Sequence, residues 1–461
     1  MEIIFSRFAA MDRILKIPGK APKDIMLAGF CLNLFAGPPV ETRSPFSLTG
    51  CNPIRTLPAF PPDFHGLASP PVSRPLTLFF MAKLRKIHGQ QSWTFGTAEV
   101  EAAVTRTGGH LGPVRFLLGD RWVQPFDLAP WADEKLKIEM PPILRVLRGD
   151  FFCMPFGGNE KPYATGQGAE QFPPHGETAN SQWKYEASTS QRLALSMETT
   201  IRKGRVDKTI ELVPGQSALY SQHLISGMKG PMTFGHHAIL KLPAPNAGRL
   251  SMSKFVFGQV FPGAFEEPAK GGYSILKPGA KFSSLRRVPQ VDGKFADLSI
   301  YPSREGYEDL VLMGSDAKLP FAWTAMTIPS EGYVWFALKD PRVLRSTVFW
   351  MSNGGRHYAP WSGRHRHAIG LEEVTSNFHY GLAESAKLNA LNRAGIPTCV
   401  RMEPGKPLAV NYIMAVAAIP RGFDIVKTIH PSADGQSVIL TSESQMAVTA
   451  LLNLSFLTKG T

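Results

Sequence analysis

The sequence predicts an all-β fold with few, short helices. From about residue 90 onward, short runs rich in Val, Ile, Phe, Tyr and Thr alternate with turns rich in Gly, Pro, Asn and Asp. This spacing is typical of a large antiparallel β protein. Helical periodicity is scarce, and its best candidate is Tyr380–Arg393. We expect strands at Ala98–Arg106, Val114–Leu118, Leu193–Thr200, Lys208–Val213, Leu219–Ser226, Phe255–Phe261, Gly332–Leu338, Ser346–Ser352, Thr398–Glu403, Ala409–Ala418 and Ser437–Thr441.

Residues 1–80 differ in composition from the rest of the chain. They hold 12 of its 39 prolines, and so many prolines cannot sustain a regular ladder or helix. Two interpretations remain open for this part. It is either a disordered extension or upstream sequence ahead of a true start near Met81. We expect residues 85–458 to form one domain.

Bulk composition excludes several classes of function. The net charge of +13 would suit a polyanion, but the chain has no long Lys/Arg block and no recognition helix, so we expect no nucleic-acid partner. No apolar run reaches the ~18 residues needed to span a bilayer. The four cysteines are widely spaced and form no Cys-x-x-Cys pair, which favours a reducing compartment, the cytoplasm. Gly-rich nucleotide-binding motifs are also absent from the sequence.

Two segments combine a rigid turn with a polar side chain. Arg148 precedes a short strand that ends in a Pro-x-Gly turn, and its guanidinium offers donors suited to hydroxyls or carboxylates. Further on, Pro173, Pro174 and Gly176 hold His175 in a non-helical loop that leads to Trp183. A tryptophan face can stack on a sugar ring. Taken alone, however, a turn histidine and a core tryptophan explain this second segment better.

A third segment, Phe234–Leu242, carries two adjacent histidines. Neighbouring residues of a strand point to opposite faces, so His236 and His237 cannot easily bind one metal ion together. Pairing with His365 and His367 is conceivable, but no His-Glu-x-x-His motif or matching carboxylate spacing supports a metal site. We therefore expect no metal.

The fourth segment, Trp361–Thr375, ends in two acids. Ala368–Leu371 is expected to be a buried strand that leads into Glu372 and Glu373, which point to opposite sides. A carboxylate at the end of a buried strand is a reasonable general base. A solvated acidic turn explains this segment equally well.

Together and in this order, the four segments resemble the galactose mutarotase-like superfamily of aldose 1-epimerases. That family has a histidine in a Pro-x-His-Gly loop, a second histidine on a mid-chain strand and a late glutamate in a Gly-Leu-Glu segment. The matching residues here are His175, His237 and Glu372, with His236 and Glu373 as the fallback positions.

One branch of the family, the hexose-phosphate mutarotases, gives a more detailed match. Its motif is His-Gly-Phe-Ala-Arg-Asn-x-x-Trp, and His175, Gly176, Asn180 and Trp183 match it at identical spacing. The arginine of the motif is replaced by Ala179, which argues against a phosphorylated substrate.

The resemblance covers roughly residues 90–455 and implies a large twisted β-sandwich, or supersandwich, that binds a small-molecule sugar. It implies that Glu372 acts as the base and His237 as the acid of anomer interconversion, without metal or cofactor. This assignment needs an ionised Glu372 and a protonated His237, a state that opposite charges favour in each other. His175 belongs to the same catalytic group and, with Arg148, would hold the ring oxygen and neighbouring hydroxyls. Asn180 is a further expected sugar-binding residue, with His236 and Glu373 as the alternatives. Trp183 and Trp361 either stack on the sugar or pack in the core.

Two other functions remain open. A non-catalytic carbohydrate-binding protein on the same fold would tolerate loss of Glu372 or His237. A polysaccharide-cleaving hydrolase or lyase is the second alternative, but a hydrolase needs two carboxylates across the scissile bond. The sequence offers one such region, Glu372 and Glu373.

Overall fold

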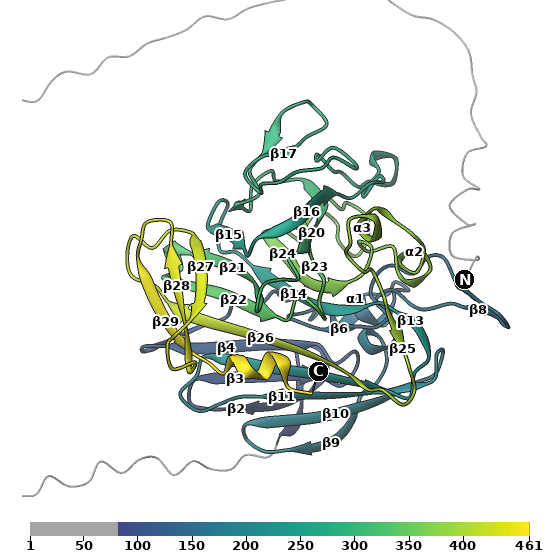
Figure 1. Cartoon of the computed structure of the whole chain (residues 1–461), viewed down its shortest axis with the longest axis horizontal. Helices are drawn as coiled ribbons and strands as arrows, with labels where there is room; N and C mark the ends of the chain where they lie inside the picture. The colour runs from purple at the N-terminus through teal and green to yellow at the C-terminus, as the bar shows by residue number, and fades with distance from the viewer. Residues whose placement is uncertain (1–81, 461) are drawn as a thin grey trace, which may run out of the picture. The chain divides into compact units, whose positions relative to one another are not determined.

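Antiparallel β-sheets dominate the part of the chain that the structure describes, residues 82–460 of a computed structural model (Figure 1). These residues belong to one compact unit, Pro75–Thr461. The expectations for residues 1–80 and for a start near Met81 lie outside the described residues. The all-β prediction is confirmed.

Two large sheets form the body of the described unit. Neighbouring strands in both are antiparallel. The nine-stranded sheet has the order β19 (Ile300–Tyr301), β15 (Gly248–Met252), β21 (Ala322–Ile328), β22 (Tyr333–Lys339), β26 (Leu408–Ala418), β12 (Ala218–Ser226), β11 (Gly204–Glu211), β10 (Arg192–Thr199) and β9 (Lys184–Ser188). The six-stranded sheet has the order β16 (Phe255–Val260), β20 (Tyr307–Ser315), β23 (Ser346–Asn353), β24 (Ala368–Thr375), β14 (Phe234–Lys241) and β6 (Phe152–Cys153).

Smaller sheets and short helices complete residues 82–460. A five-stranded sheet runs in chain order through β1 (Lys83–Ile87), β2 (Gln90–Gly96), β3 (Val100–Thr105), β4 (Leu111–Leu118) and β5 (Arg121–Val123). A three-stranded sheet contains β27 (Val426–Pro431), β28 (Ser437–Ser442) and β29 (Ala447–Leu451). Strand pairs are formed by β7 (Tyr163–Thr165) with β8 (Gly168–Glu170), β13 (Gly230–Met232) with β25 (Val400–Met402), and β17 (Val288–Pro289) with β18 (Phe295–Ala296). The α-helices are α1 (Pro142–Val146), α2 (Leu382–Ser385) and α3 (Ala390–Arg393), and the 3₁₀ helices are η1 (Glu177–Ala179), η2 (Pro268–Lys270), η3 (Pro329–Glu331) and η4 (Leu454–Thr458).

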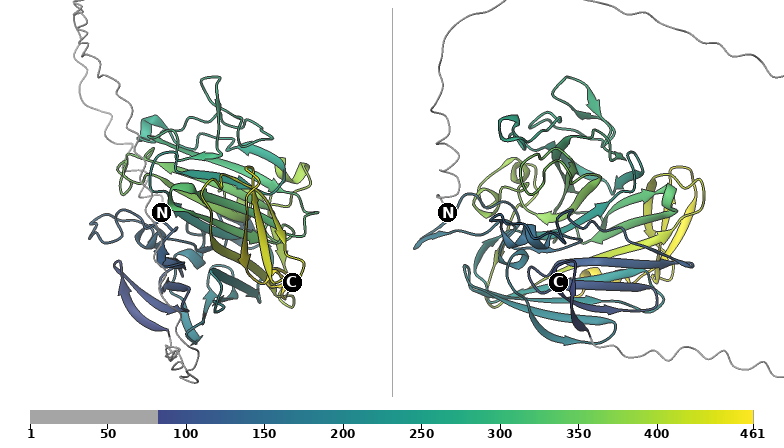
Figure 2. Two further views of the ribbon diagram at one scale, coloured as in Figure 1. Left: turned by 90° about the vertical axis from the view of Figure 1, so that its left-hand side faces the viewer. Right: turned by 180° about the vertical axis from the view of Figure 1, so that it is seen from behind.

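Three apolar cores hold the described sheets together. The first lies between the nine-, six- and five-stranded sheets and includes Val104, Ile210 and Leu371. A second core covers the other face of the six-stranded sheet, where Trp131 and Trp361 come from loops. In the third, the outer face of the nine-stranded sheet packs on β27–β29, which Figure 2 shows in yellow.

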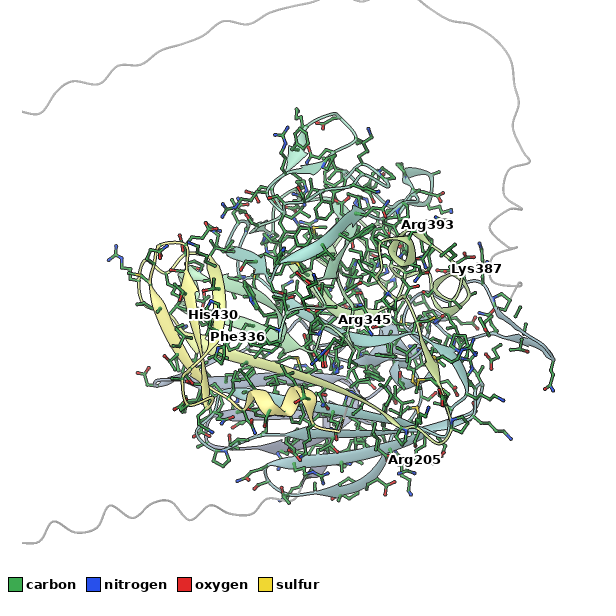
Figure 3. The ribbon with its side chains drawn as sticks, viewed as in Figure 1. Arg205, Phe336, Arg345, Lys387, Arg393 and His430 are labelled. Carbon is green, nitrogen blue, oxygen red and sulfur yellow. The ribbon has the colours of Figure 1, made fainter. Side chains whose placement is uncertain are left out.

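Apolar side chains lie in the cores, and charged side chains lie mostly at the surface. Phe336 of β22 belongs to the third core, whereas the charged side chains of Arg205 and Lys387 lie at the margins of the molecule (Figure 3). None of the helices within residues 82–460 has the length and apolar character needed to cross a bilayer.

Most of the expected strands coincide with observed ones within a few residues, but the expected helix Tyr380–Arg393 is wrong. The chain forms only the single-turn helices α2 and α3 there. Asn389 adopts an extended backbone between them, and its side chain accepts hydrogen bonds from the amides of Leu391 and Asn392. A side chain that caps a new helix in this way competes with continuation of the previous one.

The two glutamates of β24 do not follow a strand but lie inside one. All eight residues of β24 are buried, so the strand continues past Leu371 to Thr375. Glu373 faces the first core, where it forms an ion pair with the buried Lys339. The hydroxyls of Thr324 and Thr347 donate hydrogen bonds to its carboxylate, at 2.6 and 2.7 Å. Glu373 thus helps to join the two large sheets.

Replacing Glu373 with Ala should strongly destabilise the fold. The ammonium of Lys339 would stay buried without its carboxylate, and breaking such a pair costs about 3–5 kcal/mol. Urea unfolding measures this loss. The control is Glu403→Ala, which breaks an exposed ion pair with Lys406 and should lower stability far less. Equal losses in both variants would contradict the structural role of Glu373.

Candidate functional site

The centre of the candidate site is a contact between two strands. His237 of β14 lies directly opposite Glu372 of β24 in the antiparallel register. Its Nε2 atom is 3.2 Å from Oε1 of Glu372. The two side chains are only 6% and 3% exposed. One histidine and one carboxyl group therefore lie within proton-transfer distance in a nearly dry environment.

Strand alternation decides which residues share this face. Ile239, Trp350 and Val374 belong to the second core, and successive residues of a strand point to opposite faces. By the same alternation, His237 and Glu372 lie on the side of the second core, whereas His236 and Glu373 lie on the side of the first. The sequence-based expectation that each pair is split between two faces agrees with this placement.

A glycine makes room for the pair. Gly370 lies two residues before Glu372 on the same face of β24 and directly opposite Trp350 of β23. A Cβ atom at Gly370 would lie 2.8 Å from Oε1 of Glu372, 3.2 Å from Cε3 of Trp350 and 3.3 Å from Cε1 of His237. All three side chains thus converge on the space that the missing side chain leaves.

His175 reaches the same place from a strained loop. Its φ is +58° and that of Gly176 is +77°, where a Cβ would lie 1.9 Å from a backbone carbonyl oxygen. Asn180 fixes this loop, because its amide donates to the carbonyls of Pro174 (2.7 Å) and Gly176 (2.8 Å). The Asn180 carboxamide oxygen accepts from the amide of Ile143 (3.0 Å).

Aromatic rings hold the imidazoles in place. Phe151 lies between two histidines, stacked on His110 at 4.0 Å and on His237 at 4.6 Å between ring centroids. The ring of His175 meets that of His237 edge-on at 5.2 Å. On the other side, Trp350 meets His237 edge-on at 5.7 Å. These contacts leave the imidazole of His237 little freedom to turn.

Arg356 is the cation next to this pair. Its Nε donates to Oε1 of Glu266 at 2.6 Å, and it lies 4.0 Å from Oε2 of Glu308. The guanidinium also lies over the rings of Trp361 and Trp350, at 4.8 and 5.4 Å from their centroids. Its side chain is 16% exposed, so it is more accessible than His237 and Glu372.

Burial controls the protonation of the site. It raises the pKa of Glu372 well above its usual value, although Arg356 acts in the opposite direction. Burial also lowers the pKa of His237 well below its usual value, with smaller contributions from His175 and His110. The pKa of His175 falls to about 3, mainly through burial and then through His379. Burial therefore favours a proton on Glu372 over one on His237, the reverse of the expected ion pair.

Two solved structures are similar in fold to the sheets described above. A candidate aldose 1-epimerase from Escherichia coli K12 is 13% identical, and the match covers 72% of this chain and 100% of that one with a TM-score of 0.51. A galactose mutarotase-like protein from Lactobacillus casei ATCC 334 is 11% identical over 71% of this chain and 100% of that one, with a TM-score of 0.50. The chain has the galactose mutarotase-like fold. No protein-family model and no curated protein sequence matches it.

Four of the expected sugar-binding residues lie away from the His237–Glu372 pair of this mutarotase-like domain. The fully buried guanidinium of Arg148 donates to the backbone carbonyls of Val146, Ile87 and His88. Trp183 is a core residue whose indole donates to the carbonyl of Thr178.

The two fallback residues are also engaged on the opposite face. Nδ1 of His236 is 2.8 Å from Asp150, and its ring packs against Phe152 and Tyr412. Glu373 is bound to Lys339. The geometry therefore gives no support to sugar contacts by Arg148, Trp183, His236 or Glu373, and we leave them out of the proposed site.

The remaining expected residues do gather here, together with several that sequence reasoning missed. Trp361 is 5% exposed and meets Trp350 edge-on at 5.8 Å. Trp350, Arg356, Glu308 and His379 were not expected. The two consecutive glycines before Arg356 were one signal in the sequence, because they indicate a place where two backbone segments approach closely. A Cβ at Gly355 would lie 2.3 Å from the amide nitrogen of Glu308.

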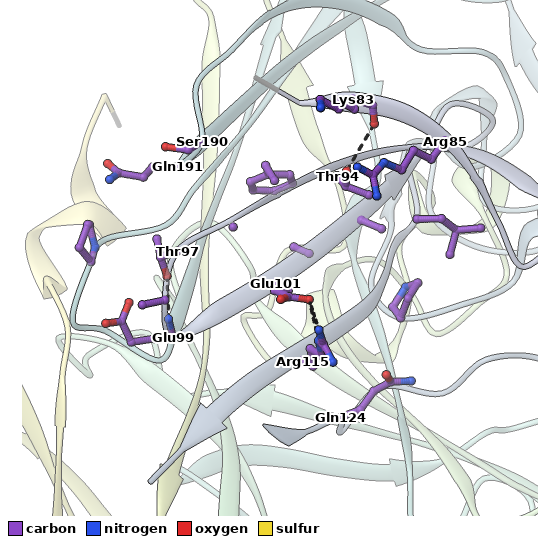
Figure 4. A pocket seen from close by; sticks show the side chains of 18 residues that line it. Lys83, Arg85, Thr94, Thr97, Glu99, Glu101, Arg115, Gln124, Ser190 and Gln191 are labelled. Atoms are coloured by element: carbon purple, nitrogen blue, oxygen red, sulfur yellow. Dashed lines mark hydrogen bonds and ion pairs between the residues drawn. The ribbon is translucent and has the colours of Figure 1, made fainter. Parts of the chain in front are cut away.

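Other places in the described residues offer less chemistry. Within residues 82–460, no group of three or more His, Cys, Asp or Glu side chains is arranged to hold a metal ion. A groove of about 780 Å³ crosses the five-stranded sheet, far along the chain from β24, and none of the site residues lines it (Figure 4). Its Arg115 and Glu101 are paired with each other at 2.6 Å.

Replacing Gly370 with Ala should disrupt the site from within. The added methyl would press on Glu372, Trp350 and His237 at once, and overpacking of this kind costs about 1–3 kcal/mol. Urea unfolding followed by tryptophan fluorescence measures the loss. Gly405→Ala is the matched control, because a Cβ there meets nothing within 4 Å. A Gly370→Ala protein as stable as the control would contradict the packing described here.

Proposed function

We propose that the protein is an aldose 1-epimerase-like isomerase that binds a small sugar and interconverts its α and β anomers. The observation that carries the proposal is the 3.2 Å contact between Nε2 of His237 and Oε1 of Glu372. His175 and Arg356 lie around this pair and are both partly exposed. The widely spaced cysteines still favour a reducing compartment, the cytoplasm.

Anomer interconversion needs only proton transfers. A base removes the proton from the C1 hydroxyl while an acid protonates the ring oxygen, the C1–C2 bond rotates, and the ring closes again. Each assisted proton transfer typically raises the reaction rate by about 10²–10⁴-fold. In our proposal Glu372 is the base, His237 is the acid, and His175 and Arg356 orient the hydroxyl groups. The apolar C–H face of the sugar ring would lie against Trp350 and Trp361.

The neutral pair that burial favours and the charged pair of the proposed reaction hold the same number of protons. Moving one proton from Glu372 to Nε2 of His237 converts the first into the second. Arg356 already lowers the pKa of Glu372, and sugar hydroxyls that donate to the carboxylate would act in the same direction. Substrate binding would therefore generate the reactive form without any exchange with solvent.

Glu372→Gln and His237→Gln should each slow mutarotation by about 10²–10⁴-fold, because each removes one proton-transfer group. The assay follows the relaxation of freshly dissolved α-glucose, α-galactose and a uronic acid by polarimetry. The exposed Glu403→Gln and His430→Gln are matched controls and should keep wild-type rates. Wild-type activity in Glu372→Gln would refute the assignment.

If the wild-type protein shows no mutarotase activity, a test of sugar binding separates the remaining alternatives. If sugar still changes the fluorescence of Trp350 and Trp361, the protein is a carbohydrate-binding module on this fold. If sugar causes no change, only the assignment of the fold remains. Glu266 and Glu308 both lie against Arg356, so a hydrolase with two free carboxylates has less support than the isomerase.

The acid limb of kcat/KM should have its midpoint below about 6.5, the ordinary pKa of a histidine. The reactive pair holds one proton. It gains a second only below the pKa of His237, which burial lowers, and loses its last only above the pKa of Glu372, which burial raises. The acid limb therefore lies at a lower pH than an ordinary histidine would give. A midpoint of the acid limb at about 6.5 or above would contradict this arrangement.

A further inference from the structure

A line of four buried polar side chains runs beside Trp350. Oγ of Ser352 donates to Oε1 of Glu308 at 2.8 Å and lies 2.6 Å from Nδ1 of His365. Nε2 of His365 lies 3.0 Å from Oδ2 of Asp127. Each of the four residues is at most 3% exposed. Their hydrogen bonds form one continuous chain from β20 to the loop after β5.

The two ends of this line lie in different surroundings. Glu308 is 4.0 Å from Arg356 and accepts a hydrogen bond from the indole of Trp350 at 3.0 Å, so it borders the candidate site. At the other end, Oδ1 of Asp127 is 3.9 Å from Nζ of Lys241, whose side chain is 43% exposed. The line therefore connects the candidate site with a surface cation.

We propose that Glu308, Ser352 and His365 form a buried proton relay, with Asp127 holding the imidazole at the end of the line that lies farther from the candidate site. In the forward step, the O–H bond of Glu308 breaks and its proton passes to Oγ of Ser352. The hydroxyl proton of Ser352 moves to Nδ1 of His365 at the same time. Glu308 is left as a carboxylate and His365 as an imidazolium, and no heavy atom has to move.

The hydrogen-bond geometry permits both end states. A serine hydroxyl has one proton to donate and can accept from the other side, so Ser352 can donate to either neighbour. With the proton on Glu308, Ser352 donates to His365, which donates to Asp127. With the proton on His365, both ring nitrogens donate, and the carboxylate of Asp127 stabilises the imidazolium.

Several charged or titratable groups surround the relay. Arg356, His365 and Ser352 favour the ionised form of Glu308, whereas Glu266 opposes it. Burial outweighs them and raises the pKa of Glu308 to about 7, so its protonated form is populated near neutral pH. Tyr358 and Tyr301 also lie within electrostatic reach of Glu308.

The relay would set the charge next to Arg356. When Glu308 is protonated, Glu266 is the ionised carboxylate paired with Arg356. When the proton moves to His365, Arg356 faces two carboxylates. Glu308, Ser352 and His365 are therefore positioning residues that act on the site through Arg356. This inference goes beyond the proposed isomerase, and it can be tested without any sugar.

Nuclear magnetic resonance of the full chain can follow both ends of the relay. The ¹³C-labelled carboxyl of Glu308 and the ¹⁵N-labelled ring of His365 are titrated with pH in one sample. They are assigned by the signals that Glu308→Gln and His365→Gln remove. A relay couples the two sites, so both signals should show the same macroscopic midpoints. Two independent single midpoints in the wild-type protein would overturn the proposal.

Ser352→Ala separates a relay from electrostatic coupling, which acts through space and survives loss of the hydroxyl. It removes the bridging hydroxyl and adds no bulk, so the proton should no longer exchange directly between Glu308 and His365, and the exchange broadening of the His365 ring nitrogens should be lost. Exchange broadening that persists in Ser352→Ala would overturn the relay. The control is Ser442→Ala, a buried serine of β28, which should leave the exchange unchanged. A protein that lacks mutarotase activity would still show the coupling, so the two proposals fail independently.

Discussion

The antiparallel register between β14 and β24 is the constraint on which the candidate site depends. It sets His237 opposite Glu372 and His236 opposite Glu373. Because side chains alternate along a strand, a slip of one residue would exchange the two faces and move every polar group into the wrong core. The register is secured on both sides, since β24 also pairs with β23 and β14 also pairs with β6. The contact between His237 and Glu372 is thus a consequence of sheet geometry and not of a flexible loop.

The same pair of strands serves two purposes. On the face of the first core, Glu373 and His236 take part in buried polar contacts that join the sheets, with Lys339 and Asp150 respectively. On the face of the second core, Glu372 lies opposite His237, and Nδ1 of His237 has no hydrogen-bond partner in the described residues. Nε2 of His236 and Oδ1 of Asp150, on the other face, lack such partners as well.

Burial is also the dominant electrostatic influence in this region. It opposes charge on Glu372, Glu308, His175 and His237 alike. Arg356 is the exception, because two carboxylates and the faces of aromatic rings compensate its desolvation. Proton positions in the site therefore respond to small changes, such as a bound hydroxyl or a shift along a hydrogen-bonded chain. This sensitivity suits acid–base chemistry on a neutral sugar.

Local sequence signals were sufficient for the fold class and for part of the site. Alternating apolar runs marked most strands, and the order of the His175, His237 and Glu372 segments indicated the mutarotase-like fold. These signals failed where another interaction competed with the structure or the role that the local sequence favoured. The residues Tyr380–Arg393 have helical spacing, but the side chain of Asn389 restarts the chain as a separate turn. Arg148 has the chemistry of a sugar ligand, but backbone carbonyls occupy its donors.

The sequence by itself determined that His236 and His237 point to opposite sides, and that Glu372 and Glu373 do so too, because the alternation of side chains is a local property of an extended chain. It could not determine that these faces coincide, since that depends on which strands pair and in which register. Arg356, Trp350 and Glu308 entered the site for the same reason, from strands and loops distant in the chain. The members of the line from Glu308 to Asp127 are as much as 238 positions apart in the sequence, and only the packing of β20, β23 and their loops brings them within hydrogen-bonding distance.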